Sequence, residues 1–130
     1  MPGLHKILCV DDEQDILDIA KLSLEAIGGF EVLTCTGSHR ALEKFASFRP
    51  DLVLLDVMMP DLDGPAILAA IRQLEGGEAV PALFMTAKVQ PAEKAAYLKM
   101  GAIGVISKPF DPMTLPEDIQ ALWSENHAAR

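Results

Sequence analysis

The sequence predicts an α/β fold in which a five-stranded parallel sheet is doubly wound, with helices on both of its faces. Two observations support this prediction. Five short apolar segments recur along the 130 residues, and a segment with helical character follows each of them. A chain of this length favours one domain. We expect that domain to span residues 1–130, with its core at about residues 5–124.

The expected strands are short, and most of them lack polar alternation, as is typical of strands covered on both faces. They lie at residues 6–10, 30–35, 52–57, 82–86 and 103–107. Parallel strands that follow one another in the chain need a crossover connection. Right-handed crossovers then place helices on both faces of the sheet.

The first two helices are indicated by apolar residues that recur three or four positions apart. In the first helix these residues are Ile16, Ala20, Leu24 and Ile27. This spacing is that of residues on one side of a regular α-helix. In the second helix the apolar residues lie within residues 41–46.

Glycine and proline bound the later helices. The third is expected to begin at Gly64-Pro65, because the first turn of a helix does not need the N–H that proline lacks, and to end at Gly76-Gly77. The fourth, at residues 91–100, has the weakest apolar pattern. The last is expected from residue 112 or 114 to about residue 123, which leaves residues 126–130 as a loose end.

Charge and hydropathy exclude several classes of function. The net charge of −8 repels nucleic-acid phosphates and anionic lipid headgroups, so direct nucleic-acid binding is not expected. No segment approaches the ~20 apolar residues that span a bilayer. The start of the chain lacks the features of a secretory signal, and we therefore expect a cytoplasmic protein.

Cys9 and Cys35 each lie in an apolar run and are expected to be buried, reduced thiols.

Five polar residues stand where the expected strands end. Asp11 and Asp12 follow the first strand, Asp56 lies at the end of the third, Thr86 ends the fourth and Lys108 follows the fifth. In open parallel sheets, ligands bind outside the carboxyl ends of the strands, where the strand order reverses. If the first strand is central and the third lies beside it, the three aspartates converge there.

Three carboxylates at one place predict a bound cation. Close carboxylates repel one another by about 1 to 4 kcal/mol per pair, so a positive group must lie among them. Oxygen ligands of this kind suit Mg²⁺ or Mn²⁺. With the Lys108 ammonium and the Thr86 hydroxyl, they form the set of groups that phosphoryl transfer needs. Asp56 is the candidate nucleophile, because it ends a buried strand and is held rigidly.

Each of these residues also has a plain structural interpretation. Asp12 could cap the first helix, and Asp56 could belong to a turn. Thr86 is of a type that is common in strands, and Lys108, before Pro109, could be an ordinary surface lysine. These interpretations do not explain why all of them fall at the same edge of one sheet.

In order and spacing, the motifs of this chain resemble the receiver domain of bacterial response regulators. The resemblance covers the whole chain and rests on ILCVDDE at residues 7–13, LLDVMMPDLDG at 54–64, FMTA at 84–87 and KPF at 108–110. It implies a flavodoxin-like (βα)5 fold with strand order 2-1-3-4-5. It also implies that Asp56 accepts a phosphoryl group from the phosphohistidine of a histidine kinase or histidine phosphotransfer protein in a two-component system.

The resemblance further implies how a metal is held. Asp12 and Asp56 would bind Mg²⁺ directly, and Asp11 would bind it mainly through water. The backbone carbonyl of Met58 would complete the ligands that the protein provides.

The same resemblance implies how phosphorylation is sensed. Lys108 would contact the phosphoryl oxygens, its peptide bond to Pro109 would be cis, and Thr86 would turn toward the phosphate. Many relatives carry an aromatic residue where this chain has Val105, which puts the usual coupling between the threonine and that ring in doubt. We expect a shifted fourth helix or altered loop packing to carry the signal instead.

We therefore expect a regulatory domain that assists its own phosphorylation and dephosphorylation, and not an enzyme with a separate substrate. Its surface over residues 91–123 would meet a downstream protein target, and a homodimer is possible. No output domain follows Trp123, so we favour a stand-alone regulator over a receiver excised from a longer protein.

Three alternatives remain open. The first is a scaffold receiver that is never phosphorylated. The second is an aspartate-nucleophile phosphohydrolase, which usually carries a second aspartate where this chain has Met58. The third is a flavin-binding electron carrier, whose phosphate Asp11 and Asp12 would repel.

Overall fold

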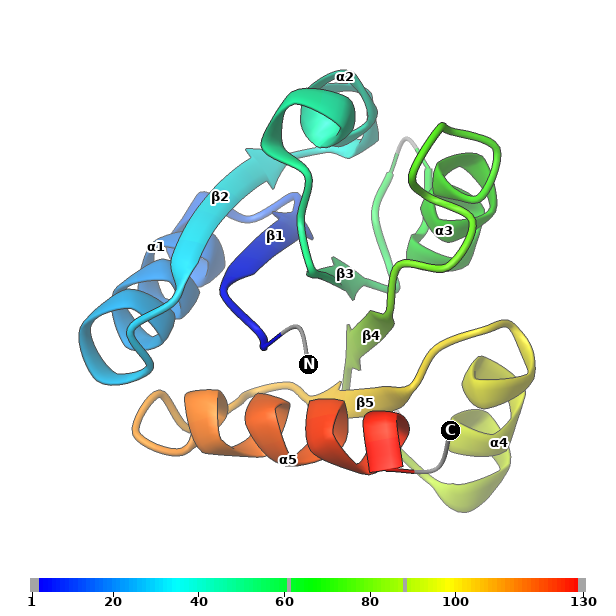
Figure 1. Ribbon diagram of the computed structural model, residues 1–130. Coiled ribbons are helices and arrows are strands. Elements are labelled where there is room, and N and C mark those ends of the chain that lie inside the picture. Colours follow the sequence, from blue (N-terminus) through cyan, green and yellow to red (C-terminus); the bar gives the residue numbers. More distant parts are fainter. Residues whose placement is uncertain (1–2, 61, 88, 129–130) are drawn as a thin grey trace.

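The computed structural model describes residues 3–60, 62–87 and 89–128. Five parallel strands form one sheet in the order β2-β1-β3-β4-β5, as expected, and helices cover both faces (Figure 1). The strands are β1 (Lys6–Asp11), β2 (Glu31–Thr36), β3 (Leu52–Asp56), β4 (Ala82–Thr86) and β5 (Gly104–Ser107). The helices are α1 (Gln14–Leu22), a π-helical turn η1 (Ser23–Ile27), α2 (Ser38–Phe48), α3 (Gly64–Ile71), α4 (Pro91–Lys99) and α5 (Leu115–Ala128).

The register of the sheet sets the ends of β1 and β3 side by side. Val10 pairs with Leu55, so Asp11 and Asp56, the last residues of the two strands, leave the sheet at the same edge. The chain crosses from β1 to β2 on one side and continues with β3 on the other. The strand order therefore reverses between β1 and β3, and ligands bind at such switch points.

Two apolar clusters cover the two faces of the sheet. On one face β1, β3 and β4 pack against α1 and α5, with Leu17, Leu115 and Ile119 buried. On the other face they pack against α2 and α3, with Phe45 and Ile67 buried. Because side chains of both orientations are buried, these strands are apolar without alternation, which is the pattern that the sequence shows.

The two cysteines are buried as expected, but on opposite faces. Cys9 packs among the side chains beneath α1 and α5, whereas Cys35 belongs to the cluster beneath α2 and α3. Burial raises the pKa of the Cys9 thiol to about 12. Buried thiols of this kind are inert, so neither cysteine is a candidate nucleophile.

The first helix differs from the expected pattern at its end. Ala20 and Leu24 are buried, but Ile27 is 50% exposed. The reason is the π-helical turn η1, in which the wider winding changes the angle between successive side chains and moves Ile27 off the buried face. A prediction that assumes regular α-helical spacing fails at this residue.

The ends of two further helices were predicted wrongly. Helix α3 ends at Ile71 and not at Gly76-Gly77, because Arg72 donates hydrogen bonds to the carbonyls of Gly77 and Val80 and holds the segment in turns. Helix α5 begins at Leu115 and continues to Ala128, well beyond residue 123.

The additional turn of α5 is held by its own side chains. The His127 ring stacks on Trp123 with centroids 4.1 Å apart, and its Nδ1 atom lies 3.0 Å from the Trp123 carbonyl oxygen. Residues 126–128 are therefore helical and not a loose end, whereas residues 129–130 lie outside the described part of the chain. Among the described residues, no helix combines the length and the apolar character needed to cross a membrane.

Candidate functional site

Three carboxylates gather at the edge of the sheet where β1 and β3 end. One oxygen from each of Asp11, Asp12 and Asp56 lies within 4.8 Å of the others, and we call these residues the acid cluster. Asp11 and Asp56 are buried at the ends of their strands, whereas Asp12 lies in the loop after β1 and is exposed. The cluster is thus rigid on its inner side and open to solvent through Asp12.

Lys108 brings a positive charge into direct contact with the cluster. Its Nζ atom lies 3.0 Å from Asp11 Oδ2 and 3.2 Å from Asp56 Oδ1, and its side chain is 18% exposed. The Lys108 N–H donates to the Thr86 carbonyl oxygen at 2.9 Å, which holds the start of the β5–α5 loop against β4. The peptide bond between Lys108 and Pro109 is cis, as expected.

Thr86 ends β4 and is 4% exposed. It lies at the same edge as the cluster, because Met85, the residue before it, pairs with Asp56. All five site residues expected from the strand ends are therefore at one edge of the sheet. The Met58 side chain points outward and is 70% exposed, in the loop that follows Asp56.

Gly64 brings the β3–α3 loop close to the cluster. A Cβ atom at this position would lie only 2.7 Å from the Asp56 carbonyl oxygen, nearer than a side chain can approach backbone. Its N–H donates to the Val57 carbonyl oxygen at 3.0 Å. The sequence indicated Gly64 as a helix start and as the end of the motif at 54–64, and its role in shaping this loop is visible only in three dimensions.

Two backbone hydrogen-bond donors at the cluster were also not predicted from the sequence. The Glu13 N–H donates to Asp11 Oδ1 at 3.0 Å, and the Met58 N–H donates to the Asp56 carboxylate. Backbone donors carry no residue-type signal, so only the folded loops reveal them.

The environment of Asp56 makes its charge costly. Burial, followed by the neighbouring Asp11 carboxylate, raises the pKa of Asp56 from 3.8 to about 6, and Lys108 offsets this only in part. For Lys108 itself, burial favours a lower pKa, but the contact with Asp11 and the charges of both aspartates outweigh it and raise the pKa. At neutral pH, Asp56 is ionised and Lys108 is protonated.

The raised pKa of Asp56 predicts how stability depends on pH when divalent cations are removed by a chelator. Between pH 3.8 and about 6 the folded state holds a proton on Asp56 that the unfolded state has lost. The free energy of unfolding should therefore fall as pH rises through this window, by up to about 3 kcal/mol for this group. Urea unfolding of the wild type and of Asp56→Asn, compared at about pH 5 and about pH 7.5, measures the difference. Parallel pH profiles for the two proteins would contradict the expectation.

The residues of the cluster fit a hard divalent cation. The buried Asp11 Oδ2 atom has no well-directed hydrogen-bond donor among the described residues, although Lys108 Nζ lies close to it. All three donor groups are carboxylates, which Mg²⁺ and Mn²⁺ prefer over nitrogen and sulfur ligands. A cation here would relieve the repulsion that a single lysine leaves among three acids.

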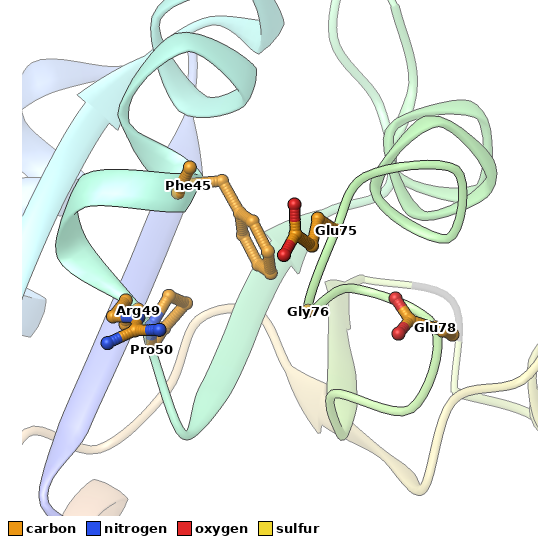
Figure 2. Close-up of a pocket in the computed structure, with 7 residues that line it drawn as sticks. Phe45, Arg49, Pro50, Glu75, Gly76 and Glu78 are labelled. Carbon is orange, nitrogen blue, oxygen red and sulfur yellow. The ribbon is translucent and has the colours of Figure 1, made fainter.

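A large hollow of the structure lies away from the acid cluster. It measures about 750 Å³ between the end of α2 and the loop that follows α3 (Figure 2). Arg49 and Pro50 lie on one side of it, and Glu75 and Glu78 lie on the other. No residue of the acid cluster lines it, so this hollow is separate from the candidate site.

Fold and site together define the class of the protein. The strand order 2-1-3-4-5 is the order of flavodoxin-like α/β proteins. Such proteins bind their ligands at the switch point, where this chain has its charged residues. Residues 7–120 match the family model of the response regulator receiver domain. The chain therefore belongs to the response regulator receiver family.

Individual relatives agree with this assignment. The chain is 36% identical over 124 residues to the alkaline phosphatase synthesis transcriptional regulatory protein PhoP of Bacillus subtilis (strain 168), a match that covers 95% of this chain and 50% of the relative. The chain thus spans about half the length of that relative. It is also 33% identical over 114 residues to an uncharacterized 14.6 kDa protein of Leptolyngbya boryana, covering 88% of this chain and 86% of the relative.

Solved structures show the same fold. The chemotaxis response regulator CheY4 of Vibrio cholerae superimposes with a TM-score of 0.84 at 32% identity, covering 92% of this chain and 99% of that chain. A CheY-like response regulator receiver domain protein of Methanospirillum hungatei JF-1 superimposes with a TM-score of 0.80 at 29% identity, covering 98% and 100%. These similarities confirm the family that the sequence motifs indicated.

Proposed function

We propose that this chain is a phosphorylation-controlled switch of a two-component system. Asp56 accepts a phosphoryl group from a histidine kinase or histidine phosphotransfer protein in a reaction that depends on Mg²⁺, and the product binds a downstream protein differently. The observation that carries this proposal is the acid cluster with Lys108 between Asp11 and Asp56, at 3.0 and 3.2 Å.

The chemistry follows from these groups. An Asp56 carboxylate oxygen attacks phosphorus and forms a P–O bond, while the P–N bond to the donor histidine breaks. The electron pair of that bond stays on the imidazole nitrogen. Because the other ring nitrogen carries a proton, the histidine is released as a neutral imidazole. The Lys108 ammonium lies where it can balance the negative charge on the phosphoryl oxygens. Because the pKa of Asp56 is about 6, the nucleophile is ionised at neutral pH.

Asp12 and Asp56 would bind Mg²⁺ directly, Asp11 would bind it through water, and the Met58 carbonyl would complete the protein ligands. When bound, the ion supplies positive charge that neutralises the phosphoryl oxygens and orients them. Asp12 is the exposed member of the cluster and gives the ion a route from solvent.

The signal would leave the site through Thr86 and α4. An added charge of about −1.5 to −2 at Asp56 favours the arrangement in which Thr86 and Lys108 both turn toward the phosphate. Helix α4 is the most loosely packed element on this route, because none of its nine residues, all of them described, is buried. Its main anchor is Tyr97, whose half-buried ring meets Phe84 edge-on at 5.4 Å and 81°.

Tyr97→Ala tests this route. Loss of the aromatic contact should loosen α4 and speed amide hydrogen exchange there by about threefold to tenfold in the unphosphorylated protein. Hydrogen exchange followed by mass spectrometry measures it, with Leu98→Ala as a control that removes an exposed side chain from the same helix. Equal exchange in the two variants would show that Tyr97 does not anchor α4.

The partners proposed here are proteins. The net charge of −8 opposes direct contact with nucleic acid, so we place the output in protein contacts of the surface over residues 91–123, in the cytoplasm, with a homodimer possible. The Bacillus subtilis relative is named a transcriptional regulator, and this chain matches about half of it. Where such a regulator binds DNA, we expect a region other than the receiver to do so.

Phosphorylation by a small donor tests the proposed function. Incubation with acetyl phosphate and Mg²⁺ should add one acid-labile phosphoryl group per chain, visible as an intact mass shift, on the peptide that contains Asp56. Omission of Mg²⁺ should prevent the addition. Absence of any phosphate under both conditions would favour the scaffold alternative, and sustained turnover of phosphorylated metabolites would favour a phosphohydrolase.

A further inference from the structure

A buried serine links the helix that follows the acid cluster to the loop that carries Lys108. Ser23 is 3% exposed, and its hydroxyl donates a hydrogen bond to the carbonyl oxygen of Pro112, 89 positions further along the chain. The phosphoryl chemistry described above makes no use of this residue. Burying a hydroxyl is costly unless it is hydrogen-bonded, so the bond to Pro112 stabilises this arrangement of helix and loop.

The loop from Lys108 to Thr114 is fixed from several directions. At its start, the Lys108 N–H donates to the Thr86 carbonyl oxygen. At its end, Asp111 Oδ1 accepts the Met113 N–H at 2.9 Å, which turns the chain into α5. These contacts join the loop to β4 and to itself, whereas the Ser23 hydroxyl joins it to the C-terminal end of α1.

Ser23 is the first residue of the π-helical turn that continues α1. Regular α-helix ends at Leu22, and the wider turn η1 begins at Ser23 and buries both Ser23 and Leu24. Its backbone bonds include Gly28 N–H to the Ser23 carbonyl oxygen at 3.3 Å. Such turns are rare and occur frequently at functional sites.

We propose that Ser23 is a positioning residue for Lys108: by holding the Pro112 carbonyl it fixes the β5–α5 loop, and so keeps the Lys108 ammonium between Asp11 and Asp56. Lys108 has a long flexible side chain, and its alignment depends on where its backbone is held. The kinetic part of this inference rests on the proposed role of Asp56 as phospho-acceptor. The positional part does not.

The experiment compares Ser23→Ala and the milder Ser23→Cys with Ser47→Ala. Cysteine has a side chain of similar size to serine, but its thiol is only a weak hydrogen-bond donor. This variant therefore tests the hydrogen bond even if the alanine variant folds poorly. Ser47 is a matched control, because its hydroxyl bonds only one turn back, to the Lys44 carbonyl oxygen, on the exposed face of α2. Acylation of lysines by acetic anhydride, read peptide by peptide, reports the position of Lys108 without any phosphorylation, and exposed Lys99 serves as the internal reference.

We expect both Ser23 variants to increase acylation of Lys108 relative to Lys99, because the ammonium leaves its two carboxylates. The rate of phosphorylation by acetyl phosphate should fall by about tenfold in Ser23→Ala, since small displacements of a catalytic group have large kinetic effects. In a Lys108→Ala background, Ser23→Ala should cause no further loss of rate.

Each other outcome is decisive. Unchanged Lys108 acylation in both Ser23 variants overturns the positioning role, even if the wild type is readily phosphorylated. An equal loss of rate with and without Lys108 shows that Ser23 acts through general stability and overturns it too. If the wild type takes up no phosphate while Ser23→Ala still exposes Lys108, the proposed function fails and the positioning role stands.

Discussion

Asp56→Asn is expected to abolish the uptake of acid-labile phosphate from acetyl phosphate in the presence of Mg²⁺. Asparagine has nearly the same shape as aspartate, but its neutral amide is not a nucleophile toward phosphorus. The strand that carries residue 56 is fully buried, so the substituted side chain stays in the same place. Intact mass spectrometry after incubation with the donor measures the loss.

The matched control for this variant is Asp63→Asn. Asp63 caps α3 by accepting the Ala66 N–H at 2.9 Å, and asparagine caps helices equally well. This variant should be phosphorylated like the wild type. Phosphate that persists in Asp56→Asn, on any residue, would refute the assignment of Asp56 as the acceptor.

Lys108→Ala is expected to have the second large effect. Its removal leaves the buried carboxylates of Asp11 and Asp56 without the cation that they contact, and loss of one partner of a buried charge pair costs about 3 kcal/mol. Phosphorylation by acetyl phosphate should also slow by about 100-fold, because a positive group that stabilises the transferring phosphoryl is gone.

Urea unfolding in chelator and in Mg²⁺ separates these two roles of Lys108. We expect most of the lost stability to return in Mg²⁺, because a divalent cation can replace the missing charge among the acids, while the slow phosphorylation remains. Lys99→Ala, which removes an exposed lysine from α4, is the control and should change neither quantity. Full wild-type stability of Lys108→Ala without Mg²⁺ would show that the acid cluster does not depend on this lysine.

Much of the fold and the site could be predicted because both depend on strand ends. The apolar runs located the ends of all five strands to within one residue, and a parallel sheet brings the ends of such strands to one edge. Asp11, Asp56 and Thr86 each end a strand, so their meeting required no knowledge of packing. The strand order, by contrast, came from the resemblance to receiver domains.

The features that could not be predicted depend on contacts between distant parts of the chain. The π-helical turn at Ser23 is accompanied by a hydrogen bond to Pro112, and the additional turn of α5 by the stacking of His127 on Trp123. In the sequence, Tyr97 is one residue of a weak helical pattern, and only the structure shows that its ring packs against Phe84. Patterns of local spacing do not contain these pairings.

Calorimetric titration of Mg²⁺ into the unphosphorylated protein tests most directly whether the three carboxylates hold a cation. We expect saturable binding at one site that is markedly weakened in Asp12→Asn and unaltered in Asp63→Asn. Asp12 is exposed, so its replacement leaves the packing of the core intact. No heat of binding in the wild type, or identical binding in Asp12→Asn, would show that the gathered acids serve another purpose.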